Sequence, residues 1–414
     1  MGLFRKILAF LIFVPNITLG TNTPGLGRPE IFPWAGMYAV RKDMRLTIRY
    51  ILFLGYITLS AALFFLQGNP WAIPLRSWLA LVNASVIFFT IIHIEDEEFK
   101  FINRAFLYVF AANVFVTLLQ TFHIFPQSLV RMMNFFIERW EPTSWENGRG
   151  SGGLFAEPSY YAFGVHHYFA YALLLFDIKQ RSRIGLILTA AMAVYDMTVV
   201  RSLTGLIIMT IYVVSHQDWR KAWKGTLAIL AIGLTALYFY GQSNPLPRAL
   251  DFVYNVVFEQ RYKDLFTYVT WEGGIRTVSL LASYPFGIFH PFGWGIGSWP
   301  QGSITALLDM GLSEIEVAFF EQYTPYDGFR PTAYSADLFL EAGVVGWLLF
   351  AGAMYPYVVN KAMWQNANTR AIVVLFLFNM LILGTIGDPL PFLFLALAYR
   401  TIHPPDPKPI EVSP

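Results

Sequence analysis

The sequence predicts an all-α protein that crosses a membrane about 11 or 12 times. Of its 414 residues, 56% are hydrophobic and 14% are charged, whereas a soluble domain carries about a quarter charged residues. Apolar runs of about 20 residues, the length that crosses a bilayer, recur along the chain. Aromatic residues make up 17% of the chain, as is typical of the belts at membrane interfaces. Together these features favour many spans over one large soluble core.

The apolar runs also predict the order of the chain. A first span is expected at 7–19, followed by a return at 31–40 that is short enough to be a re-entrant hairpin instead. Further spans are expected at 48–66, 78–94, 105–125, 160–176, 184–200, 203–214, 227–240, 336–359, 371–386 and 390–398. Four parts follow: 1–240 with helices and an outer loop at 126–157, 241–334 as a large and partly helical loop, 335–400 with the last helices, and 401–414 as a tail.

The distribution of basic residues predicts the orientation. If the amino terminus is cytoplasmic, most of the 29 Lys and Arg residues flank the cytoplasmic ends of spans, as the positive-inside rule requires. Both termini are then cytoplasmic, and the two long loops lie on the other side. The basic residues on that outer side are almost all arginines, with Lys263 as the exception. They are Arg28, Arg76, Arg131, Arg139, Arg149, Arg201, Arg248, Arg261, Arg276 and Arg330.

Arginine on the outer face indicates an anionic ligand there, because its planar and permanently charged fork binds phosphate or carboxylate through two bonds. The simpler alternative is ion pairing with acidic residues of the same loops, such as Glu138, Glu146 and Asp251. The chain has no cysteine, which excludes disulfides, thiolate zinc sites and a cysteine nucleophile. Its outer loops also lack clustered carboxylates of the Asp-x-Asp kind, so no metal and no cofactor are expected.

The most informative motif begins at Arg149, continues through the glycine-rich run 150–153 and ends at Glu157-Pro158-Ser159. The glycines allow a tight turn and a close approach to a ligand. Pro158 suits the first position of a helix, which puts Glu157 at the positive, outward-facing end of that helix. The alternative is that Glu157 only caps the helix and pairs with Arg149.

Two further arginines lie at the same outer surface. Arg201 interrupts a long apolar hairpin, just before Gly205, and its alternative role is that of an anchor at the membrane edge. Arg276 lies in the large loop, which is expected to have helical pieces at 250–268 and 273–283 and then an irregular glycine and aromatic stretch at 284–299. Arginines from three separate segments could converge on one diphosphate.

On these motifs the chain resembles the Wzy-type O-antigen and exopolysaccharide polymerases, within the O-antigen polymerase and ligase superfamily of membrane glycosyltransferases. The resemblance covers about half of the chain, 149–346, including a re-entry into the membrane at 334–346. An arginine followed eleven positions later by a glycine, a pattern of these polymerases, occurs at Arg276/Gly287 and Arg139/Gly150. The resemblance implies a GT-C-like membrane fold whose large loop is periplasmic.

The resemblance also implies an activity, at the periplasmic face of a bacterial inner membrane. A polymerase of this kind transfers a growing glycan from undecaprenyl diphosphate to a hydroxyl of the next lipid-linked repeat unit. Donor and acceptor are both lipid-linked oligosaccharides, and membrane lipids, a chain-length regulator and a flippase are the other implied partners, without nucleic acid. Arg149, Arg201 and Arg276 would stabilise the diphosphate, and Glu157 would be the general base.

Other outer residues are candidates for substrate binding. They are Arg261, His290, Arg330, Tyr334 and Asp337. Asp337 and His290 are also the next candidates for the general base after Glu157. His166 and His167, two to three turns into the 160–176 span, are expected either to be buried and hydrogen-bonded or to line the path of the lipid or glycan.

Two other functions remain as alternatives. One is an O-antigen ligase that transfers the glycan to lipid A core or to protein. The related ligases would place a histidine just before the re-entering span, where this chain has Tyr334 and Ser335, and this difference favours a polymerase. The other is a non-enzymatic polysaccharide translocator, which would be expected to show internal symmetry and charged, broken helices at the membrane midplane.

Overall fold

The computed structural model describes most of the predicted membrane domain. The described residues are 1–18, 33–41, 44–137, 140, 150–179, 182–216, 278–311, 330–382, 384 and 386–404. Within these residues every regular element is a helix and none is a strand. Among them, 5 helices are long and apolar enough to cross a membrane. The chain is therefore an all-α polytopic membrane protein, as the sequence predicts.

Each of the five long apolar helices overlaps one predicted span, and the largest difference in a start is nine residues, Asp96 against 105. They are α3 (Ile48–Leu66), α4 (Ala72–Ile91), α5 (Asp96–Thr121), the continuous pair α8 and η1 (Arg183–Val200), and α15 (Tyr334–Val358). The other helices of the domain are α1 (Leu3–Leu11), α2 (Trp34–Ala39), α6 (Gln127–Phe136), α7 (Pro158–Leu175), α9 (Leu203–His216), Val278–Phe289, α13 (Trp299–Asp309), α16 (Lys361–Gln365), α17 (Ala367–Leu381) and α18 (Leu390–Ile402). The predicted span 227–240 and the predicted helix 250–268 lie outside the described residues.

The first part of the chain differs from its prediction. α1 has 9 residues and α2 has 6, and at about 1.5 Å per residue neither can cross a bilayer. Residues 12–14, beyond the end of α1, are buried in the core, and the indole N–H of Trp34 donates to the backbone carbonyl of Ile17. Residues 19–32 lie outside the described residues, so the choice between a full first span and a re-entrant hairpin stays a prediction.

The described part of the large loop is helical at residues where an irregular stretch was predicted. The helix Val278–Phe289 includes Tyr284 to Gly287, which the sequence analysis assigned to an irregular stretch. Gly287 packs directly against α15, where a Cβ would lie 2.2 Å from the backbone oxygen of Phe339. This close approach explains why a glycine is present within a helix here.

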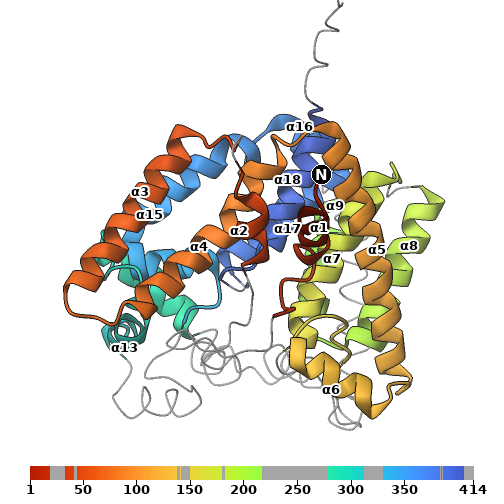
Figure 1. The fold of residues 1–414 in the computed structure, drawn as a ribbon, viewed down its shortest axis with the longest axis horizontal. Helices are drawn as coiled ribbons and strands as arrows, with labels where there is room; N and C mark the ends of the chain where they lie inside the picture. The colour runs from red at the N-terminus through yellow and green to blue at the C-terminus, as the bar shows by residue number, and fades with distance from the viewer. Residues whose placement is uncertain are drawn as a thin grey trace, which may run out of the picture.

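Two groups of helices lie on either side of α17 and α18, as Figure 1 shows. One group contains α3, α4, α13 and α15, and the other contains α5, α7, α8 and α9. α18 contacts α4 and α7, and α17 contacts α7, α9 and α15, so the central pair joins both groups. The amino terminus and α16 lie at one end of the molecule, and α6 and α13 lie at the opposite end. This separation agrees with the predicted alternation of the spans.

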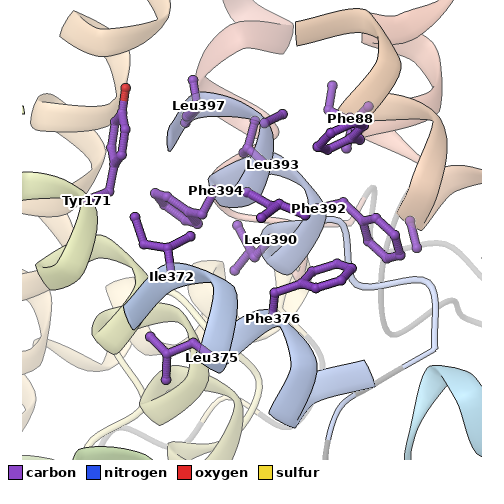
Figure 2. Packing of buried hydrophobic residues seen from close by; sticks show 14 of the residues in the cluster. Phe88, Tyr171, Ile372, Leu375, Phe376, Leu390, Phe392, Leu393, Phe394 and Leu397 are labelled. Carbon is purple, nitrogen blue, oxygen red and sulfur yellow. The ribbon is translucent and has the colours of Figure 1, made fainter. Parts of the chain in front are cut away.

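α18 forms the centre of the core because it is apolar on all sides, which is typical of a helix buried on every face. All its residues from Leu390 to Ala398 are buried. Figure 2 shows Phe392 and Phe394 packed among side chains of the neighbouring helices. The surrounding rings and aliphatic groups come from Phe88 of α4, Tyr171 of α7, and Ile372, Leu375 and Phe376 of α17.

α15 is broken at Gly343, whose backbone angles are φ 64° and ψ −175°. A side chain at this position would place its Cβ 2.2 Å from the backbone oxygen of Pro291. The loop after helix Val278–Phe289 bonds to the broken turn: the N–H of Gly295 donates to the carbonyl of Glu341, and the carbonyl of Pro291 accepts from Val345. These bonds satisfy backbone groups that the interrupted helix cannot pair internally.

A polar cluster joins α1, α2 and α5 at the amino-terminal end of the molecule. The carboxylate of Glu98 accepts from Arg5 at 2.7 Å, from Arg41 at 3.4 Å and from the hydroxyl of Tyr38. Burial, together with the neighbouring Glu98, raises the pKa of Tyr38 far above its ordinary value, so Tyr38 remains a proton donor. The cluster fixes the two short helices against a long one.

Candidate functional site

The glycine-rich segment after Arg149 packs directly against the turn at Arg201. The backbone N–H of Ser151 donates to the carbonyl of Val199 at 2.9 Å. At Gly150, a Cβ would lie 1.6 Å from the backbone oxygen of Val200, so only glycine permits this contact. Two segments that the sequence analysis assigned to one anionic site are therefore adjacent in space.

Arg201 ends a short π-helix, η1 (Asp196–Val200), that continues α8. Its backbone is left-handed, with φ 47° and ψ 36°, and its N–H donates to the carbonyl of Asp196 at 2.8 Å. A left-handed conformation costs a residue other than glycine roughly 1 kcal/mol, and π-helical turns are frequent at functional sites. The Arg201 side chain is exposed. The predicted interruption of the hairpin is thus a defined turn that presents an arginine.

Polar side chains of α5 form hydrogen bonds with the glycine-rich segment. The amide oxygen of Gln120 accepts from the N–H of Gly153 at 2.8 Å, and that of Asn113 accepts from Leu154 at 3.0 Å. Thr121 bonds the hydroxyl of Ser151 at 3.0 Å. The sequence analysis missed these residues, although polar groups at helical spacing inside an apolar span are the signal that could have found them.

Glu157 lies directly before α7, which begins at Pro158 as predicted. Its backbone is extended, and its side chain makes no capping hydrogen bond to the helix. The hydroxyl of Ser159 donates to the Glu157 carboxylate at 3.3 Å. Glu157 is half-buried. It therefore lies at the positive end of α7 without capping the helix through its side chain. The suggested pairing with Arg149 cannot be compared, because Arg149 lies outside the described residues.

A second polar cluster joins α4 to α15. Arg330 donates to Asp337 at 3.1 Å and to the hydroxyl of Ser77 at 2.9 Å, and Ser77 donates to Glu341 at 3.0 Å. Asp337 and Glu341 are fully buried, one helical turn apart. The structure thus joins Arg330 to Asp337, two of the predicted substrate-binding residues, and adds Ser77 and Glu341, which the sequence analysis missed. Acidic residues four positions apart in an apolar span were the available signal.

Tyr334 and His290 lie in different surroundings. Tyr334 is 1% exposed, donates to the backbone carbonyl of Leu81 at 3.0 Å and packs against Phe350, so it is a core residue at the base of the second cluster. His290 follows the helix Val278–Phe289, and its ring lies 3.7 Å from the carboxylate of Asp309, with both side chains largely exposed.

Three predicted site residues, Arg149, Arg261 and Arg276, lie outside the described residues. Their convergence with Arg201 therefore stays a prediction. In the described part of the chain, no group of three or more His, Asp or Glu side chains has a geometry that could hold a metal ion.

His166 and His167 are buried and hydrogen-bonded within α7. Their Nδ1 atoms lie 2.6 Å from the carbonyl oxygen of Ala162 and 2.8 Å from that of Phe163. The Nε2 atom of His167 lies 3.4 Å from the side-chain amide of Asn379 on α17. This agrees with the first of the two expectations for the histidine pair. The Nε2 atom of His166, in contrast, faces the carboxyl group of Asp196 at 3.8 Å.

Comparison of the chain with protein-family models, with curated proteins and with solved structures gave no match. The site geometry and the resemblance of its motifs are therefore the grounds for a functional assignment.

Proposed function

We propose that this chain is a metal-independent membrane glycosyltransferase, a polysaccharide polymerase that extends lipid-linked glycans. It would transfer the growing glycan from undecaprenyl diphosphate to a hydroxyl of the next lipid-linked repeat unit. The observation that carries the proposal is the packing of Gly150 on Val200, because it sets the segment after Arg149 beside the turn that presents Arg201. Glu157 follows in the same segment, at the start of α7.

The arginines supply the electrostatic part of the reaction. As the bond between the sugar and the diphosphate breaks, its electron pair moves to the diphosphate oxygen, and negative charge grows there. Guanidinium groups already held in place stabilise this charge and contribute several kcal/mol in a site that excludes water. Arg201 and Arg149 are assigned to this role from adjacent segments, and Arg276 is assigned to it from the large loop.

Glu157 is the proposed general base. The acceptor hydroxyl forms the new bond to the anomeric carbon and gives its proton to the Glu157 carboxylate. The half-buried position of Glu157 supports this choice over Asp337, which is fully buried and paired with Arg330. Asp337, Arg330, Tyr334, Arg261 and His290 are assigned to substrate binding around this centre.

The reaction would take place at the periplasmic face of a bacterial inner membrane, with both termini in the cytoplasm. α6 and α13 lie at the end opposite to the amino terminus, which supports placing the outer loops and the amino terminus on opposite sides of the membrane. Donor and acceptor would reach the site from the membrane. A flippase would supply the repeat units, and a chain-length regulator would limit their number.

The test is complementation of a strain that lacks the gene. Variants R149A, R201A, R201K and R276A should leave only single repeats on extracted glycolipids, while R131A, which removes an exposed arginine of α6, should restore long chains. The lysine variant separates bidentate binding from charge alone. Wild-type chain lengths in R149A, R201A and R276A would contradict the proposal.

The same gel separates the alternatives. Loss of a ligase leaves long lipid-linked polymer in the cells, whereas loss of a polymerase leaves single repeats. Purified protein in detergent should extend a lipid-linked repeat unit without any ion gradient, and a strict need for a gradient would instead indicate a translocator.

A further inference from the structure

A buried aspartate and a buried histidine face each other close to the Arg201 turn. Asp196 begins η1 and His166 lies in α7, and both side chains are 0% exposed. Neither has a role in the proposed reaction. Within the described residues, the two carboxyl oxygens of Asp196 and the Nε2 atom of His166 have no hydrogen-bond partner. Ionisable groups inside a membrane domain are costly, and they indicate a functional site by default.

The hydrogen bond of His166 to the Ala162 carbonyl places one proton on the ring. A carbonyl oxygen cannot donate, so the Nδ1 atom of His166, 2.6 Å from the oxygen of Ala162, carries a proton. On a neutral ring the Nε2 atom is then a bare lone pair, and it faces Asp196 Oδ2 at 3.8 Å. A carboxylate beside a bare nitrogen would leave one uncompensated charge in the interior, at a cost of several kcal/mol. One proton between the two groups removes that charge.

Asp196 is also the residue that fixes the Arg201 turn. Its backbone carbonyl accepts the N–H of Arg201 at 2.8 Å. Its carboxyl group packs against α9 at Gly205, where a Cβ would lie 2.4 Å from Oδ1. Asp196 therefore contacts α9 and the Arg201 turn, and its carboxyl group faces His166 of α7. Its position therefore affects where the arginine lies relative to the glycine-rich segment.

We propose that His166 and Asp196 share one proton and, as a net-neutral pair, position Arg201 for the lipid diphosphate. Asp196 and His166 are positioning residues, because neither touches the reacting atoms. The identity of the ligand rests on the proposed function, but the shared proton does not.

The experiment compares two replacements of Asp196 that keep its branched side-chain skeleton. In D196N the side chain is neutral and its amide N–H can face the Nε2 atom of His166, as the O–H of a protonated Asp196 would. In D196L the branched skeleton of four side-chain heavy atoms is kept and the donor is lost. Binding of undecaprenyl diphosphate to purified protein in nanodiscs should stay within about twofold of wild type for D196N and weaken about tenfold or more for D196L, since an unpaired buried polar atom costs about 1–3 kcal/mol.

A matched control is T198A, which removes an exposed hydroxyl from the same π-helix, and it should bind as wild type does. Equal binding by D196L and D196N would show that the pair contributes only packing, and this result would overturn the proposal. Equal loss in both variants would show that a charge is required and would overturn the neutral pair. Thermal unfolding of each variant identifies any that fails to fold.

The second measurement does not depend on the ligand. Nitrogen-15 spectra of histidine-labelled protein, with His166 assigned by its loss in H166Q, should show a protonated or hydrogen-bonded Nε2 in the wild type and a bare Nε2 in D196L. A bare Nε2 in the wild type would overturn the shared proton. If these spectra agree with the proposal but no protein binds the lipid diphosphate, the proposed function fails and the proton-sharing pair stands.

Discussion

At the scale of single residues, the outer site depends on a contact that tolerates no side chain. Gly150 touches the backbone of Val200, and the neighbouring Ser151 bonds the carbonyl of Val199. The left-handed turn at Arg201 follows directly. Because the contact involves backbone on both sides, neither partner can move aside as a flexible side chain would. The residues next to it are consequently held at a fixed separation.

The G150A substitution should therefore separate the two segments. We expect a loss of about 1–3 kcal/mol in unfolding free energy, the range for forced overpacking, and a loss of long glycan chains in complemented cells. Thermal unfolding of purified protein and a gel of extracted glycolipids measure the two effects. The control is G55A in α3, where a Cβ meets nothing within 4 Å. Normal stability and normal chain length in G150A would contradict the assigned contact.

At the scale of helices, α15 combines a predicted span with an unpredicted network. Its apolar sequence predicts a span at 336–359, and the helix found there is Tyr334–Val358. The break at Gly343 and the bonds of Asp337 and Glu341 were not predicted, because they depend on the helix and loop that pack against α15. Two buried carboxyl groups on one turn require the cation that Arg330 provides.

Removing that cation should destabilise α15. In R330A, the buried Asp337 loses its charged partner and Ser77, which bonds Glu341, loses a donor, so we expect a loss of about 3 kcal/mol in unfolding free energy. Adding D337N to R330A should restore a large part of this loss, because it removes one of the two acids. Thermal unfolding in detergent measures both variants, with R131A as the control. An R330A protein as stable as wild type, or a double variant less stable than R330A, would count against the network.

At the scale of the whole molecule, the predicted orientation can be tested directly, because the chain has no cysteine. M132C, on exposed α6 at one end, and K179C, an exposed position between α7 and α8, should lie on opposite sides of the membrane. A thiol reagent that cannot cross membranes should label M132C in intact spheroplasts and K179C only after the membrane is opened. The reverse pattern would place the site in the cytoplasm.

The sequence by itself determined the class of the protein, the position of most described spans and the motifs of the outer face. These properties are local: hydropathy, flanking charge and a proline at a helix start act over one or two helical turns. The lengths of the first two helices were not predicted, because apolar composition does not show where a helix ends within an apolar run; α1 has 9 residues and α2 has 6.

Only the tertiary structure decided which polar groups meet. Ser77 and Glu341 are 264 residues apart, Ser77 and Arg330 are 253 apart, and the pair of His166 and Asp196 joins two helices through a contact that no local pattern marks. The physical reason is that a buried polar group needs a hydrogen-bond partner, and the local sequence does not show which residue that partner is. The packing of α4, α7 and α15 decides it.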